Sequence, residues 1–130
     1  MKSFKHFLED LDLRSKTWSG APAVRNQGKL IWVDVSKFDK AWAKDLTQKK
    51  DFYLPPNSRV NAIGDRKERF GEFLQSNSAI HASTVSVRNG IISFADGRHR
   101  YAYMRDSGAK KVPIFFLKTS DFEWIKKNLV

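Results

Sequence analysis

Residues 94–108 read FADGRHRYAYMRDSG, and this stretch decides how the surrounding chain folds. The apolar run IISFA leads into it, and KKVPIFFL follows it. Short apolar runs rich in β-branched and aromatic residues are typical of strands, and a glycine after a polar, periodic stretch is typical of a helix end. The sequence therefore predicts a strand over 91–95, a turn at Asp96 and Gly97, a helix over 98–107 closed by Gly108, and a strand beginning near Pro113.

The same patterns predict the other elements. Asn89 and Gly90 join STVSV to IISFA as a β-hairpin, because such turns need a positive φ. The remaining predictions are a helix from Ser3, a loop over 14–28, a strand over 29–35, a helix from a Ser36 cap to about Lys49, a loop over 53–61, a helix over 65–77 with Phe70, Phe73 and Leu74 inward, and a last helix capped by Thr119 or Ser120. Strands alternating with helices predict an α+β or α/β domain, a small mixed sheet with flanking helices. We expect residues 30–130 to form it and residues 1–29 to be an N-terminal extension.

Composition points to a polyanionic partner. The chain has 130 residues, no cysteine, and 24 Lys and Arg against 14 Asp and Glu, a net charge of +10. A surplus of this size on a small domain attracts nucleic acid, nucleotides or anionic lipid, and the alternative is that it serves solubility alone. Lipid is the weaker candidate, because the cations are scattered rather than gathered on one amphipathic helix. With no signal peptide pattern and no apolar run of membrane-spanning length, we expect a cytoplasmic protein without a membrane partner.

Cations crowd the first turn of the helix predicted over 98–107. Arg98, His99 and Arg100 lie where a helix exposes unpaired N–H groups and the positive end of its dipole. Cations are unfavourable there for the helix alone. A bound phosphate would compensate, because it accepts N–H hydrogen bonds and pairs with arginine, and Gly97 would let it approach closely. The alternative is that Asp96 caps the helix and pairs with an arginine.

We therefore expect Gly97, Arg98, His99 and Arg100 to bind phosphate. A plain salt bridge remains the alternative for Arg100, and simple exposure the alternative for Arg98. His99 is also a candidate general acid or base near neutral pH, or a histidine packed against the turn.

Two carboxylates are further catalytic candidates. Asp96 could hold a metal-bound water, orient an arginine or cap the helix. Glu72 lies four residues after Glu68 on one predicted helix face, where it could serve as a base or metal ligand or simply be solvated. No spacing of His, Cys and acidic residues indicates a zinc site, and His81 is expected to be structural.

The order of these motifs resembles the ParB/sulfiredoxin superfamily. The resemblance rests on Gly97, His99, Arg100, Ala102, Gly108, Val112 and Pro113, on IWVDVSKF upstream, and on PPNSR, which would bring Arg59 to the phosphate site. It spans roughly residues 30–117. It implies a small α+β fold that binds phosphates at this helix start. Members of the superfamily include CTP-using DNA-partition proteins, nucleases, ATP-dependent kinases and the sulfinic acid reductase.

Two departures from that family narrow the function. Arg98 stands where sulfiredoxin has its catalytic cysteine, and the chain has no cysteine, so sulfiredoxin chemistry is excluded. The chain also ends soon after the resembling region, so the site recognition of partition proteins is not expected. We expect a DNA-binding domain, with metal-dependent cleavage left open. The alternatives are a nucleotide-dependent enzyme using Mg²⁺ with ATP or CTP, and a non-catalytic adaptor or inhibitor.

Overall fold

The computed structural model describes residues 13–44, 53–56, 66–118 and 121–130. The predicted helix from Ser3 and the predicted site residue Arg59 lie outside these ranges. The described elements are, in chain order, β1 (Thr17–Ser19), β2 (Gly28–Asp34), α2 (Val35–Ala43), α3 (Arg66–Ser76), β3 (Ala79–His81), β4 (Ser83–Arg88), β5 (Ile91–Asp96), α4 (Arg98–Asp106), β6 (Lys111–Leu117) and α5 (Phe122–Asn128).

Four strands form a mixed sheet in the order β2-β6-β4-β5. β2 and β6 are antiparallel, β6 and β4 are parallel, and β4 and β5 are antiparallel. The strand predicted to begin near Pro113 begins two residues earlier, at Lys111. Pro113 is tolerated inside it because pairing with β4 starts only at Ile114, so Pro113 is flanked by β2 alone.

A second, two-stranded sheet was not predicted. β1 and β3 pair in parallel, with Thr17 opposite Ala79 and Ser19 opposite His81. The prediction of a loop throughout 14–28 is therefore wrong for β1. Three residues carry too little periodicity to indicate a strand, and the partner lies some sixty positions away in the chain. Leu13 and Trp18 are buried in the core, so this part of residues 1–29 packs against the rest of the protein.

Local signals placed the hairpin and the helix ends. Asn89 and Gly90 have φ angles of 54° and 76°, as the predicted turn requires. At the end of α4, Gly108 has a φ of 97°, and the N–H groups of Gly108 and Ala109 donate to the carbonyls of Arg105 and Met104. These two hydrogen bonds form the Schellman motif, which is expected where a helix is followed by glycine.

The N-caps predicted for α2 and α5 are wrong. Asp34, not Ser36, caps α2 by accepting a bond from the Lys37 N–H, and Asp121 caps α5 in place of Thr119 or Ser120. In both cases the helix begins at a different residue from the one predicted. An aspartate at that residue accepts the backbone N–H hydrogen bond of the N-cap. α2 ends at Ala43, and the predicted end near Lys49 lies outside the described residues.

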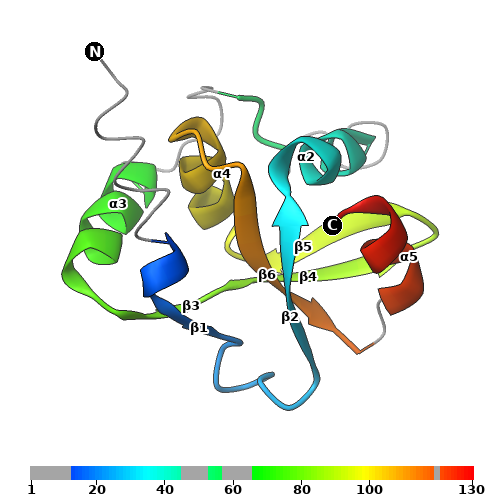
Figure 1. The fold of residues 1–130 in the computed structure, drawn as a ribbon, viewed down its shortest axis with the longest axis horizontal. Coiled ribbons are helices and arrows are strands. Elements are labelled where there is room, and N and C mark those ends of the chain that lie inside the picture. Colours follow the sequence, from blue (N-terminus) through cyan, green and yellow to red (C-terminus); the bar gives the residue numbers. More distant parts are fainter. Residues whose placement is uncertain (1–12, 45–52, 57–65, 119–120) are drawn as a thin grey trace.

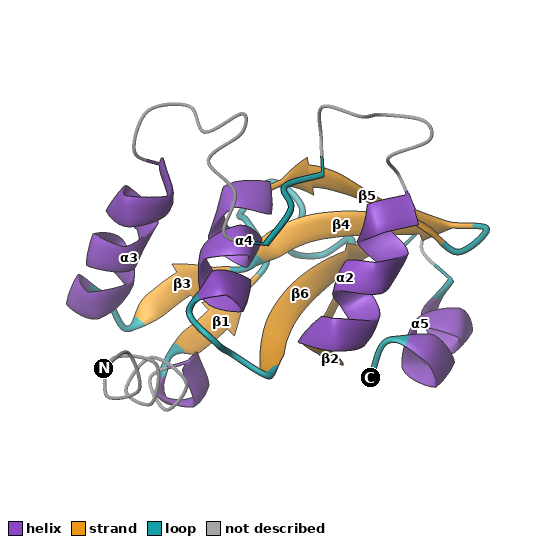
Figure 2. Cartoon of the chain, turned by 90° about the horizontal axis from the view of Figure 1, so that it is seen from above, coloured by secondary structure: helices purple, strands orange, loops and turns teal. Residues whose placement is uncertain are grey.

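Helices cover the four-stranded sheet from one side. Figure 1 shows α2 and α4 above the sheet, with α3 and the β1–β3 pair at one end and α5 at the other, and Figure 2 shows α2 and α4 side by side from above. Phe38, Ala41 and Trp42 of α2 are buried, as are Ile125 and Leu129 near the C-terminus. The mixed α+β class is therefore confirmed.

None of the helices in the described part of the chain is long and apolar enough to cross a membrane.

Candidate phosphate-binding site

A pocket of about 680 Å³ lies at the start of α4. Its walls come from α3, β3, the end of β5 and the first turn of α4, and its lining residues are Arg69, Phe70, Phe73, Ile80, His81, Phe94, Ala95, Asp96, Gly97, Arg98, His99 and Arg100. Ligand pockets for small molecules span roughly 300–1,000 Å³. The predicted turn and helix start thus form one wall of a cavity large enough for a ligand.

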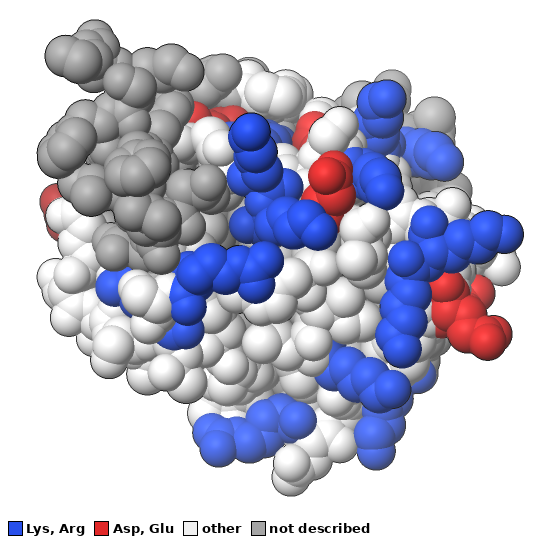
Figure 3. All heavy atoms as spheres, in the orientation of Figure 1, with Lys and Arg blue, Asp and Glu red and all other residues white. Residues whose placement is uncertain are grey.

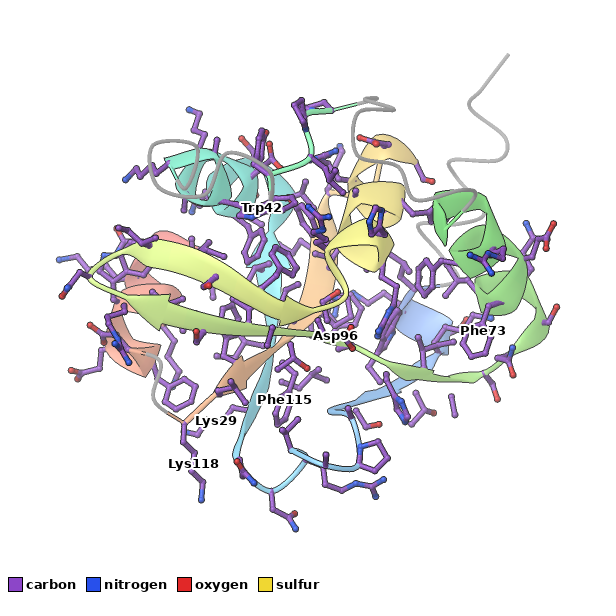
Figure 4. The ribbon with its side chains drawn as sticks, turned by 180° about the vertical axis from the view of Figure 1, so that it is seen from behind. Lys29, Trp42, Phe73, Asp96, Phe115 and Lys118 are labelled. Atoms are coloured by element: carbon purple, nitrogen blue, oxygen red, sulfur yellow. The ribbon has the colours of Figure 1, made fainter. Side chains whose placement is uncertain are left out.

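A β-bulge turns Asp96 out of the core. Along β5, Ile92 and Phe94 are buried, and strict alternation would bury Asp96 as well. The register shifts here: Thr84 pairs with Asp96 while Val85 pairs with Phe94, which leaves Ala95 as an extra residue. The extra residue reverses the alternation, and both Ala95 and Asp96 are exposed. Figure 4 labels Asp96 where β5 runs into α4.

Gly97 makes the turn from β5 into α4. Its φ of 88° is in the left-handed region, and a Cβ there would lie 2.7 Å from Ser83 Oγ. The Ser83 hydroxyl in turn donates to the Gly97 carbonyl at 2.8 Å. Gly97 is itself the N-cap of α4, without a side-chain cap bond. The alternative that Asp96 caps the helix is therefore wrong, because the next residue, Gly97, occupies the N-cap position.

Asp96 instead pairs with Arg100. Arg100 Nη2 donates to Asp96 Oδ2 at 2.9 Å, and Arg100 Nη1 donates to the His81 carbonyl at 2.8 Å. The side chains of Arg100 and Asp96 are 26% and 61% exposed, so solvent screens this pair and its net stabilisation is only about 0–1 kcal/mol. The salt bridge named as the alternative for Arg100 is thus present.

Arg98 and His99 also line the pocket. Arg98 is half-buried, and His99 is 8% exposed. Within the described residues, His99 Nε2 makes no hydrogen bond, although the residue has other contacts. Gly97, Arg98, His99 and Arg100, four of the five residues predicted to bind phosphate, all line this pocket.

Of the other two predicted site residues, only Glu72 belongs to the described part of the chain. Glu72 is exposed on α3 and does not line the pocket. Arg59 lies outside the described residues. No group of three or more His, Asp or Glu side chains that could hold a metal ion occurs within 13–44, 53–56, 66–118 and 121–130.

Sequence reasoning missed Arg69, Phe73 and His81. Phe73, predicted to face the core, is 47% exposed, whereas its neighbours Phe70 and Leu74 are buried as predicted. His81, expected to be structural, has an exposed side chain that lines the pocket. The spacing of Arg69 and Phe73, one helical turn apart, was the only available signal, and it does not tell a pocket wall from a solvated face.

α3 reaches the pocket because it packs closely against α4. A Cβ at Gly71 would lie 2.8 Å from the Tyr103 ring, so the absence of a side chain there permits the contact. The Phe70 and Tyr103 rings meet edge to face, with centroids 5.8 Å apart. This packing sets Arg69 and Phe73 of α3 beside the cationic first turn of α4.

A buried polar network holds the other end of α4. Arg105, with a side chain 6% exposed, donates to Asp39 and Asp106 at 2.9 Å each and to the Leu54 and Pro55 carbonyls. Burial alone would lower the pKa of Arg105, but hydrogen bonds to the two aspartates raise it above its ordinary value. The guanidinium therefore stays charged and links α4 to α2 and to the segment 53–56.

Two tyrosines complete this network. The Tyr53 hydroxyl donates to Asp39 Oδ2 at 2.7 Å, and the Tyr101 hydroxyl donates to Asp39 Oδ1 at 3.1 Å. Burial, together with the nearby Asp39 carboxylate, raises the pKa of both tyrosines above their ordinary value. α4 is thus fixed at its C-terminal half, while its first turn faces the pocket.

The surface charge is strongly positive. Several described acids are engaged within the protein: Asp34 and Asp121 cap helices, and Asp39, Asp96 and Asp106 pair with arginines. Exposed cations include Arg25, Lys29, Lys111, Lys118 and Lys126. Figure 3 shows Lys and Arg spread over the face drawn in Figure 1, with few Asp or Glu between them. A long polyanion would meet an attractive field on this face.

No protein-family model matches this chain, and neither a curated protein nor a solved structure matches it. The ParB/sulfiredoxin resemblance therefore stays a prediction from the motif residues.

Proposed function

We propose that the chain is a phosphate-binding domain of the ParB/sulfiredoxin type that acts on nucleic acid, and that it holds a DNA phosphate at the first turn of α4. The observation that carries this proposal is the joint lining of one pocket by Arg69, Arg98 and Arg100 together with His99. Arginine forks and helix N-termini are the groups that proteins use most often to hold phosphate.

The net charge of +10 favours a polymer as the source of the phosphate. A pocket that bound only one small anion would not need exposed cations spread over a wider face, whereas a DNA backbone offers many phosphates to such a face.

A free nucleotide is the second candidate ligand. The pocket has a volume of about 680 Å³ and an apolar lining of Phe70, Phe94 and Ile80. It therefore suits a compact ligand that carries both a ring and a phosphate. A nucleotide-dependent enzyme using ATP or CTP would employ the same arginines. An adaptor that kept the fold would bind neither ligand tightly.

Fluorescence anisotropy across a salt series tests the proposal. Labelled DNA is titrated with wild type, Arg100→Ala and Arg88→Ala, and then challenged with ATP or CTP. Arg88 is exposed in the hairpin and does not line the pocket, so it is the matched loss of one positive charge. We expect Arg100→Ala to weaken binding by about tenfold and Arg88→Ala to weaken it far less, since a charge-assisted hydrogen bond is worth about 1.5–3 kcal/mol.

The salt series separates the ligand classes. Binding of a DNA backbone weakens steeply with salt, and losing one phosphate contact lowers the slope by about one unit. Displacement of DNA by low concentrations of nucleotide would favour the nucleotide-dependent enzyme. The absence of binding to either ligand would overturn the proposal and leave the adaptor.

A further inference from the structure

We propose that the pocket takes an unpaired nucleotide, with a base stacked on Phe73, so that the protein binds single-stranded DNA in preference to duplex. This inference rests on the proposed function, because it assumes that the α4 first turn holds a phosphate of the same strand.

The exposure of Phe73 calls for an occupant. Its side chain is 47% exposed on α3, while Phe70 and Leu74 already supply the buried contacts of that helix. The exposed part of this aromatic ring leaves apolar area in water. Phe73 nevertheless lines the pocket, so the ring forms an apolar part of its rim. Figure 4 labels Phe73 on α3, and Asp96 at the end of β5.

The cations stand beside this ring. Arg69 precedes Phe73 by one helical turn, and Arg98 and Arg100 line the same pocket from α4. The close packing of α3 on α4 at Gly71 holds the two helices that carry the ring and the arginines side by side. A nucleotide offers both complements, a flat aromatic base and a negatively charged phosphate.

Base pairing decides whether a nucleic acid can contact both the Phe73 ring and the arginines. In a duplex the faces of the bases are stacked on one another and cannot meet Phe73. In a single strand each base offers a π-face, and stacking on an aromatic side chain is tolerant of sequence. A pocket that combines a phosphate site with an exposed ring therefore selects strands with unpaired bases.

The test compares a labelled single-stranded oligonucleotide with the same sequence annealed to its complement. Wild type, Phe73→Leu, Phe73→Trp and Leu30→Ala are titrated with each. Leu30 is an exposed apolar residue of β2 that does not line the pocket, so its variant controls for general loss of apolar surface. A fluorescent adenine analogue within the strand reports stacking directly, because its emission is quenched by an adjacent ring.

We expect wild type to prefer the single strand, and Phe73→Leu to lose about five- to tenfold in affinity for it, the lower part of the range for stacking on an aromatic residue. Phe73→Trp should retain the affinity and the quenching, and Leu30→Ala should change neither. Equal affinity for duplex and single strand, or unchanged quenching in Phe73→Leu, would overturn this inference while DNA binding stands. Failure to bind any DNA would overturn the proposed function as well.

Competition with a free mononucleotide tests whether the pocket recognises a base as well as a phosphate. Competition by CMP or AMP well below the concentration of phosphate needed for the same effect supports base recognition in the pocket. Competition by inorganic phosphate as effective as that by the mononucleotides contradicts it, because phosphate lacks the ring.

Discussion

Both terminal nitrogens of the Arg100 guanidinium donate a hydrogen bond. Whether a ligand could replace the acceptor depends on what that acceptor is. The His81 carbonyl is part of the β3 backbone and cannot leave, whereas the Asp96 carboxylate is an exposed side chain. A phosphate oxygen can take the position of the carboxylate and keep the carbonyl bond intact. Under the proposed function, Asp96 would therefore compete with the phosphate for Arg100.

Replacing Asp96 with asparagine tests this competition. Asp96→Asn removes the negative charge while keeping the size of the side chain, so binding of DNA should strengthen by about two- to fivefold at low salt, the worth of an exposed ion pair. The measurement is anisotropy with the oligonucleotide used above. If Asp96 were catalytic instead, its replacement would abolish catalytic turnover, and it would not raise the affinity for DNA in a way that depends on Arg100.

Two controls make that result specific. Glu72→Gln removes the same charge from an exposed residue of α3 that does not line the pocket, and it should give a smaller gain. In the Arg100→Ala background the gain from Asp96→Asn should vanish. An equal gain in Glu72→Gln, or a gain that persists without Arg100, would contradict the competition.

At the scale of the element, α4 joins the site to the scaffold. Its first turn faces the pocket, and its last turn carries Arg105 into the network with Asp39 and Asp106. The bulge at Ala95 and the left-handed Gly97 set its direction, and the Schellman closure at Gly108 ends it. A helix held in this way keeps Arg98 and Arg100 in position before any ligand arrives.

Replacing Arg105 with methionine should cost about 3–5 kcal/mol of unfolding free energy, because it leaves the carboxylates of Asp39 and Asp106 buried without their cation. Urea denaturation measures the change, and Arg88→Met, an exposed substitution, should stay within about 0.5 kcal/mol of wild type. If Arg105→Met does not fold, Arg105→Lys keeps the charge without the planar fork and should lose a smaller, measurable amount. Stability of Arg105→Met within about 1 kcal/mol of wild type would show that the network contributes little.

At the scale of the whole molecule, the stability of the fold depends on pH through Tyr53 and Tyr101. Below the ordinary tyrosine pKa of 10.0, Tyr53 and Tyr101 are protonated in the folded and the unfolded chain alike, so their contribution is fully present. Above that pH the unfolded chain releases these protons while the folded protein retains them. Unfolding is then favoured, and stability falls as the pH rises toward the raised pKa of the folded state.

Thermal unfolding between pH 8 and pH 11 should reveal this loss, up to about 1.4 kcal/mol per pH unit for each tyrosine that ionises only in the unfolded chain. Tyr53→Phe and Tyr101→Phe should each be less stable than wild type at pH 8, because Asp39 loses a donor. Each should also show a shallower fall above pH 10. An unchanged slope in both variants would exclude the tyrosines as its cause.

The sequence alone determined the features that depend on residues near one another in the chain. The hairpin at Asn89 and Gly90, the helix closed by Gly108, the mixed α+β class and the cluster of cations after Gly97 follow from backbone preferences, periodicity and charge. These properties are local, so a few neighbouring residues are enough to predict them.

Only the tertiary structure decided the features that join distant segments. The pairing of Thr17 with Ala79, the bulge that exposes Asp96, and the bond from Arg100 to the His81 carbonyl each depend on where another element packs. Phe73 shows the reason most clearly. Its helical spacing fits a core position, but whether a face of α3 meets the core or a pocket is decided by the elements packed around it, and no local pattern contains that information.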